Sequence, residues 1–382
     1  MLLKSKDNQN IKCSLTKKQV SAFRMHRHHL INRAPLTSLE KVVGDVCGIQ
    51  TQLMSSAQIA LWTRIQDLTP EHVDRALFQK RTIVKTWCMR GTVHLLQTTD
   101  LPIYVGALKQ SGLRASQHWL TRHGVSQKEV ENMVSAIVKV LAHGPLTRQE
   151  LTKRVVAFLG PKVKRWIEHS WGDVVKQVCL QGLACFGPNY GQNITFVRLD
   201  HWLTNFSNLS AEEAKTILFR RYLQGYGPAT LQDFAAWSGM SVKETRLIME
   251  QLENEVYKVN IDGQEALLIH RDLAEIQALK ISHKTVRLLP SFDPYMLGHR
   301  NKDHIVDKLY YKQVYRKAGW LSPVVLINGR VMATWRYEHH GRRLFVTVTP
   351  FDNISRSHRD SIEQEVKDLG RFLGSAFCKV IF

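Results

Sequence analysis

Acidic side chains are scarce in this sequence of 382 residues, in which 33 Asp and Glu stand against 53 Lys and Arg, for a formal net charge of +20. An imbalance of this size predicts a polyanionic partner, either nucleic acid or an acidic membrane surface. The sequence has no strongly basic amphipathic helix with a bulky apolar face, the usual signature of membrane-surface binding. Nucleic acid is therefore the favoured partner.

Several motifs are also missing. The six cysteines form no C-x-x-C pair, which excludes a zinc ribbon or dithiol motif and predicts reduced, mostly buried thiols in a cytoplasmic protein. No apolar run approaches the ~18 residues of a membrane-spanning helix, and we expect no membrane association. The polar start lacks the apolar core of a signal peptide. A phosphate-binding P-loop and a carboxylate cluster for two-metal chemistry are absent as well. We therefore expect neither a metal nor another cofactor.

A short motif, in which Pro and Thr are followed by an acid, marks the start of three predicted helices. Its copies are Pro35 to Glu40, Pro145 to Glu150 and Pro228 to Asp233. In each, a Thr can cap the helix while the acid three residues later reaches back, as in a capping box. A short helix, a longer amphipathic helix and two strand-like runs follow each copy of the motif. This order is typical of the winged helix-turn-helix, although capped helices are common enough to recur by coincidence.

The C-terminal part differs, because strand-like runs at Val324 to Ile327 and Val331 to Tyr337 flank the hairpin turn Asn328-Gly329, and a helix over about 354–373 is expected to close the chain. We predict an α+β fold, mainly α, of tandem winged helix-turn-helix units. The predicted divisions are a polar N-terminal tail at 1–15, a first unit at 16–125, a second at 126–205, a third at 206–282 and a β-rich domain at 283–382.

Two glutamines stand in Gly48-Ile49-Gln50-Thr51-Gln52, directly before an apolar-faced helical run. The side chains of Gln50 and Gln52 point the same way in extended backbone and diverge in a helix. The two amides therefore converge only if the backbone of Gly48 to Gln52 is non-helical as it leads into the helix, and Gly48 makes such a bend easy. Each amide offers an acceptor oxygen and an NH₂ donor. Such a pair can orient a water molecule where the leaving base is already cationic, as in 7-alkylguanine. The alternative is a pair of solvated or helix-capping amides.

These residues carry a resemblance. Four parts of the sequence resemble motifs of the AlkZ-like DNA glycosylases. They are Gly48 to Gln52 with Ala60-Leu61-Trp62-Thr63-Arg64, then Met89-Arg90-Gly91-Thr92-Val93-His94-Leu95, then Leu289 to Tyr295, and finally Asn328 to Arg336. The matches run in the expected order from about residue 16 to the end. Gln52 places the chain with the branch that has Gln, not Asp, at the second motif position. Thr51 stands where the family has a small or apolar residue, which leaves the lesion range open.

The resemblance implies a monofunctional glycosylase in which Gln50 and Gln52 are the catalytic pair and water is the nucleophile. It also implies tandem winged helices in a C-shaped array that holds double-stranded DNA with alkylated or crosslinked purines. We expect a monomer that is cytoplasmic and associated with the nucleoid. Asp293, beside Phe292 and Pro294, is most simply interpreted as a turn residue, with a role near the active site as the alternative.

Basic side chains are the candidate DNA contacts. On alternating strand positions Arg90, Thr92 and His94 share one face and can line the DNA side near Gln50; equally, they can form a salt bridge and a satisfied histidine behind the hairpin. Further candidates are Arg148, Lys153, Arg154, Lys243, Arg246, Arg300, Lys302, Arg330 and Arg336.

The predicted function is hydrolysis of the N-glycosidic bond of cationic alkylpurines in DNA, together with unhooking of interstrand crosslinks. The first alternative is a non-catalytic winged-helix transcriptional regulator in which both glutamines are surface amides. An RNA-binding protein is a third reading, but it would be expected to show aromatics on an exposed sheet.

Overall fold

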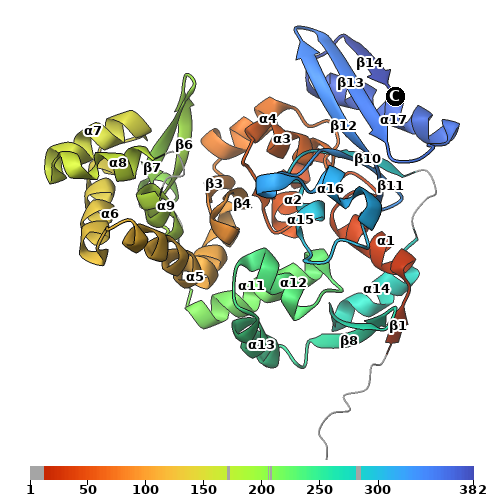
Figure 1. The fold of residues 1–382 in the computed structure, drawn as a ribbon, viewed down its shortest axis with the longest axis horizontal. Helices are drawn as coiled ribbons and strands as arrows, with labels where there is room; N and C mark the ends of the chain where they lie inside the picture. The colour runs from red at the N-terminus through yellow and green to blue at the C-terminus, as the bar shows by residue number, and fades with distance from the viewer. Residues whose placement is uncertain (1–12, 170–172, 205, 207–208, 281–284) are drawn as a thin grey trace, which may run out of the picture.

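The computed structural model describes residues 13–169, 173–204, 206, 209–280 and 285–382. In that part of the chain the fold is α+β, with three sheets of three strands and one of five. Figure 1 shows one lobe, α6 to α9 with β6 and β7, at one end of the molecule; the long helix α5 (Leu101–Arg122) leads into it, and its Phe186 packs against Trp87 with ring centroids 4.7 Å apart. None of the described helices is long and apolar enough to span a membrane.

The same order of elements occurs three times. The first set consists of α2 (Leu39–Asp45), β2 (Ile49–Gln50), α3 (Met54–Trp62), α4 (Pro70–Asp74), β3 (Ile83–Trp87) and β4 (Val93–Gln97). The second consists of α6 (Gln127–Leu141), β5 (Leu146–Thr147), α7 (Arg148–Leu159), α8 (Lys164–Glu168), α9 (Asp173–Leu180), β6 (Ala184–Tyr190) and β7 (Asn193–Arg198). In both sets the third strand lies between the first and the second, in the orders β2-β4-β3 and β5-β7-β6.

The third set lacks a full first strand. It consists of α11 (Ala211–Tyr226), α12 (Leu231–Ser238), α13 (Val242–Gln251), β8 (Val256–Ile261) and β9 (Gln264–Ile269). A single bridge between Ala229 and Leu267 takes the place of the short strand. All three sets therefore place helices before a hairpin. They differ in the first strand, which is present in the first two sets and reduced to one bridge in the third.

Two of the three predicted capping boxes are confirmed. Thr147 and Glu150 start α7, and Thr230 and Asp233 start α12, with the reciprocal hydrogen bonds present in both. The first box is wrong. A 3₁₀ turn precedes α2, so the helix begins after Ser38 and has no side-chain cap, and Glu40 instead accepts a 2.7 Å hydrogen bond from the hydroxyl of Thr82.

The N-terminal segment packs against the third set. Cys13–Leu15, placed by the sequence at the end of a polar tail, form strand β1, which pairs parallel with β8. Helix α1 (Lys17–Arg27) follows, and the guanidinium of Arg27 bonds to Asp272 at 2.8 Å. Arg24 donates to the carbonyl oxygen of Pro228. A strand that precedes the first set and the hairpin of the third set thus form one sheet.

The C-terminal domain is a five-stranded sheet covered by a helix. Its strands, in spatial order, are β10 (Val286–Leu289), β11 (Val324–Ile327), β12 (Arg330–His340), β13 (Arg343–Pro350) and β14 (Phe377–Ile381), and helix α17 spans Arg356–Phe372. The predicted turn is confirmed, because Asn328 and Gly329 both have positive φ and join paired strands. The expectation that a helix closes the chain is wrong, since β14 follows α17 and pairs parallel with β13.

Two apolar cores meet around the first set. Val42, Ile49 and Leu61 belong to a core shared with the C-terminal sheet and α17. Cys47, Val84 and Leu96 belong to another, shared with α5, α11 and α12. Strand β2 therefore lies where the first set, the third set and the C-terminal domain come together.

Candidate active site

The segment that carries the two glutamines is the expected non-helical approach to a helix. Gly48 has φ +90°, Ile49 and Gln50 form β2, and α3 begins only after Leu53. This φ strains any residue with a Cβ, and a Cβ at Gly48 would also lie 3.2 Å from the carbonyl oxygen of Leu95 and 2.6 Å from a methyl carbon of Leu96, so the position favours glycine. The prediction that the backbone is extended at Gln50 is confirmed.

Gln50 and Gln52 differ in their surroundings. Gln50 is 9% exposed and stands opposite His94 in the β2–β4 ladder, whereas Gln52 is exposed. Thr51 between them is buried; its amide donates to Val93 at 2.7 Å, and its hydroxyl has no hydrogen-bond partner among the described residues. One amide is thus held by the protein and the other faces solvent, with a buried polar hydroxyl between them.

Arg90 contacts the first glutamine. Its Nη2 donates to Gln50 Oε1 at 3.3 Å, and its Nη1 donates to the carbonyl oxygen of Trp237 in α12. Burial lowers the pKa of the Arg90 guanidinium, but arginine keeps its proton in proteins at neutral pH, so Arg90 is a cation. The guanidinium therefore polarises the amide of Gln50 and ties it to the third set of elements.

The face expected to hold residues 90, 92 and 94 is not a continuous strand. A 3₁₀ turn, Met89–Gly91, separates β3 from β4, and Arg90 within it has φ +54°. Thr92 turns its hydroxyl back to the carbonyl of Met89 at 3.1 Å. Arg90 alone of the three reaches Gln50 by a side-chain hydrogen bond that the structure describes.

His94 is a buried, neutral imidazole. It is 2% exposed, and its Nδ1 lies 3.0 Å from the carbonyl oxygen of Thr92, to which it donates. Burial, with a smaller effect of Arg90, lowers the pKa of His94 to about 3. His94 supports the strand beside Gln50 and, as placed here, offers no surface to a phosphate.

The other predicted DNA contacts divide by exposure. Those that are exposed are Lys153, Arg154, Lys243, Arg246, Arg300, Arg330 and Arg336. Arg148 instead donates to the carbonyl of Ile167 at 3.0 Å, inside the second set. Lys302 is buried and donates to the carbonyl of Met296 at 2.9 Å, so the assignment of Lys302 as a phosphate contact is wrong.

Sequence reasoning missed a buried ion pair behind α3. Arg64 and Asp293 are both 0% exposed, with Nη2–Oδ1 at 2.7 Å and Nη1–Oδ2 at 2.8 Å. Asp293 is therefore more than a turn residue, because it fastens the end of α3 to the loop after β10. The sequence did contain a sign of this pair, because Arg64 stands at the end of an apolar helical run. An arginine that is buried at such a position needs a buried acid as its partner.

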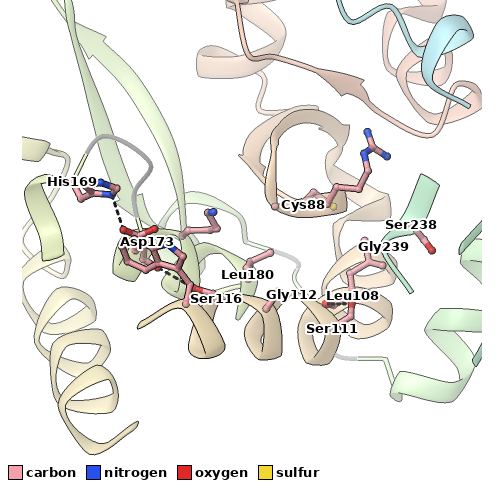
Figure 2. A pocket seen from close by; sticks show the side chains of 15 residues that line it. Cys88, Leu108, Ser111, Gly112, Ser116, His169, Asp173, Leu180, Ser238 and Gly239 are labelled. Carbon is pink, nitrogen blue, oxygen red and sulfur yellow. Dashed lines mark hydrogen bonds and ion pairs between the residues drawn. The ribbon is translucent and has the colours of Figure 1, made fainter. Parts of the chain in front are cut away.

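A cavity of about 550 Å³ opens next to Arg90. Its walls come from the turn at Arg90, from α5, from α9 and from the end of α12 (Figure 2). Trp119 and Lys176 are among the lining residues. Asp173 also lines the cavity, so it carries charges of both signs, and Arg90 links this space to Gln50. Because the walls come from all three sets, no local pattern in the sequence predicted the cavity.

Buried neutral histidines predict acid sensitivity. His28, His94 and His299 are at most 6% exposed, and burial lowers the pKa of each below 6.5. Below pH 6.5 the unfolded chain then binds more protons than the native one. The contribution of these histidines to the free energy of unfolding is therefore fully present above pH 6.5 and falls on acidification. Each of the three histidines contributes about 1.4 kcal/mol over the pH unit below 6.5. The free energy of unfolding should therefore be about 4 kcal/mol lower at pH 5.5 than at pH 7.5.

Urea unfolding at the two pH values measures this effect. His94→Gln should reduce the pH dependence, whereas His340→Gln, at an exposed position, should leave it unchanged. An equal free energy of unfolding at pH 5.5 and 7.5 would show that these histidines are not held neutral.

Comparison with known proteins identifies the relatives of this chain. The family model "DNA glycosylase AlkZ-like" matches residues 43–372. An interstrand DNA cross-link repair glycosylase of Streptomyces sahachiroi is 31% identical over 366 residues, which cover 94% of this chain and 96% of the relative. The solved structure of the Streptomyces sahachiroi DNA glycosylase AlkZ superposes with a TM-score of 0.85 at 29% identity, covering 96% of this chain and 100% of that one.

Proposed function

The chain belongs to the AlkZ-like DNA glycosylase family, and from this premise we propose that its substrates are cationic alkylated purines of the 7-alkylguanine type in duplex DNA. We further propose that Gln50 and Gln52 position the attacking water. The observation that carries the assignment is the hydrogen bond from Arg90 to Gln50 Oε1. It fixes the oxygen of the Gln50 amide two residues before Gln52, whose side chain is exposed just ahead of α3.

The proposed reaction needs no strong base. Water oxygen bonds to C1′ of the deoxyribose while the C1′–N9 bond breaks, and the bonding pair moves into the base and neutralises its cationic ring. The base then leaves without being protonated, and the water loses its proton to solvent. Gln50 and Gln52 accept hydrogen bonds from the water and stabilise the positive charge that develops on the sugar. An unmodified guanine has no such leaving group, which makes the lesion itself a source of selectivity.

We propose that the three sets of elements are winged helices that hold the duplex in a C-shaped array. In support, each set places three or four helices before a hairpin, and the first two sets have the same sheet order. The exposed cations Lys153, Lys243, Arg300, Arg330 and Arg336 are the proposed phosphate contacts. With ~6–10 phosphates neutralised, log K should fall with log[salt] at a slope near −0.9 per contact. We propose a monomer that acts in the cytoplasm on nucleoid DNA.

Interstrand crosslinks are a proposed second substrate. A base joined to both strands cannot rotate freely into a pocket, so catalytic groups must reach it in the groove. The turn between β3 and β4 holds Arg90 next to Gln50 and is the proposed element that does so. The name of the Streptomyces sahachiroi relative supports this substrate class.

Release of free base from a duplex carrying one 7-methylguanine tests the proposal. The wild-type protein should release 7-methylguanine and leave an abasic site, without cutting unmodified duplex. If a methylated and a crosslinked duplex both stay intact, a gel-shift panel of unrelated duplexes decides what remains. Strong preference for one sequence would then favour a transcriptional regulator and reduce both glutamines to surface amides.

A further inference from the structure

One exposed segment of the C-terminal domain has no role in the site described above. Residues 307–320, here called the basic-aromatic segment, comprise two 3₁₀ turns, Lys308–Tyr310 and Lys317–Gly319, and the short helix α16 (Tyr311–Val314). Eleven of its fourteen residues are exposed. In Figure 1 α16 lies at the centre of the view, among the short elements that precede β11.

The basic-aromatic segment presents large apolar side chains to solvent. Leu309 is 81% exposed, Trp320 45% and Tyr311 37%. A single exposed apolar residue is ordinary, but several within one short segment mark an interaction surface. These three side chains are therefore expected to be covered by a partner.

The exposed charges of the segment are mainly positive, which indicates what kind of partner it can bind. Lys312, Arg316 and Lys317 are exposed and form no ion pair with any residue that the structure describes. Lys308 is paired with Asp303 at 3.3 Å. Asp307 is the single acid of the segment, and its side chain is occupied in capping the first turn, where it accepts from Leu309 N at 3.0 Å. The surface is thus cationic around its apolar side chains and fits a polyanion.

The aromatic rings are held in place. Trp320 packs edge-on against Phe292, with ring centroids 5.2 Å apart, and Tyr311 stacks on Tyr315 at 4.7 Å. The backbone between Arg316 and Trp320 closes on itself through a 2.8 Å hydrogen bond from Arg316 N. Rings fixed in this way lose little conformational entropy when a flat ligand stacks on them.

The segment is joined to the proposed catalytic helix. Trp320 contacts Phe292, and the adjacent Asp293 holds Arg64 just beyond the end of α3. Gln52 precedes the start of the same helix. Helix α3 has 9 residues, so at about 1.5 Å per residue it places Gln52 roughly 15 Å from Arg64. A bound DNA molecule is far longer than this helix.

We propose that the basic-aromatic segment binds unpaired DNA next to the lesion. Cationic side chains hold the phosphates, and Tyr311 and Trp320 stack on exposed bases, a combination typical of single-strand binding. In a duplex the base faces are covered by their neighbours, so the rings discriminate in favour of a single strand. The substrate inferred for this chain is a junction of duplex and single strand, as at a fork stopped by a crosslink. The inference rests on the proposed function for its lesion but not for its binding surface.

Fluorescence anisotropy with the full chain tests this surface. The probes are labelled oligodeoxythymidine, a duplex of equal length and a fork that joins the two. Tyr311→Ala/Trp320→Ala should weaken single-strand and fork binding by about tenfold for each ring and change duplex binding less than twofold. Phe377→Ala removes an exposed aromatic of the same domain, 50% exposed on β14, and should change none of the three.

The outcomes separate this inference from the proposed function. Base release from a 7-methylguanine duplex should survive in Tyr311→Ala/Trp320→Ala, whereas failure of the wild type to release base counts against the proposed function alone. Equal weakening on duplex and single strand, or no weakening, would overturn the stacking surface. Loss of binding to phosphatidylserine vesicles with unchanged oligonucleotide binding would assign the segment to a membrane and overturn it too. Thermal melting of each variant confirms that it is folded.

Discussion

Gln50→Ala and Gln52→Ala should each slow the release of 7-methylguanine by about 10²–10³-fold. The estimate follows from removal of one preorganised polar group that acts on the charge developed in the transition state. Because neither amide is expected to hold the duplex, the loss should fall on the rate at saturating enzyme and leave DNA affinity unchanged. Single-turnover kinetics with a labelled duplex measures both quantities.

A matched control is available on the same helix. Gln58→Ala removes a partly exposed amide of α3 and should leave base release within twofold of the wild type. Gln50→Ala also deprives Arg90 Nη2 of its acceptor, so its thermal stability is measured alongside. Wild-type rates in both Gln50→Ala and Gln52→Ala would remove the glutamines from the mechanism, even if the protein still releases base.

Asp293→Ala should lower the free energy of unfolding by about 3–5 kcal/mol, because it leaves the guanidinium of Arg64 buried without its counter-charge. Arg64→Ala should cost a similar amount. Arg64→Met/Asp293→Leu replaces both charges with apolar side chains and should recover most of the loss. Urea unfolding of the three variants measures these losses, and adding Arg64→Ala/Asp293→Ala closes the double-mutant cycle that gives the coupling energy of the pair.

The surface pair Arg220 and Glu255 serves as the control. Its N–O distance is also 2.7 Å, but the two side chains are 32% and 44% exposed, so Glu255→Ala should cost less than about 1 kcal/mol. If Asp293→Ala costs no more than Glu255→Ala, the buried pair does not fasten α3. The position of α3 matters for function because Gln52 directly precedes its first turn.

Features set by neighbouring residues could be predicted from the sequence. The capping boxes at Thr147 and Thr230 and the hairpin turn at Asn328 depend on a few consecutive side chains and their backbone preferences. The first box failed for a similarly local reason, since a 3₁₀ turn takes up Thr37 before the helix starts. The extended backbone at Gln50 followed from the glycine that precedes it.

Features set by distant residues could not be predicted. The exposed or buried state of Lys302 depends on packing around Met296 and Tyr315, and a basic residue looks the same in a sequence in either state. The partner of Arg64 lies far along the chain, and the left-handed backbone of Arg90 places its side chain on Gln50 rather than on a strand face. Such contacts exist only after the sets have packed together.

The parallel pairing of β1 with β8 has a consequence for biosynthesis. The strand Cys13–Leu15 leaves the ribosome long before its partner Val256–Ile261 is made. At about 5–20 residues per second the delay is on the order of 10–50 s. During that time Val20 and Phe23 of α1, which are buried in the finished core with Val259 and Leu268, have nothing to cover them. The nascent N-terminal segment is thus expected to be a client for a ribosome-bound chaperone, and its sheet closes only after residue 261 of 382, about two-thirds of the chain, has been made.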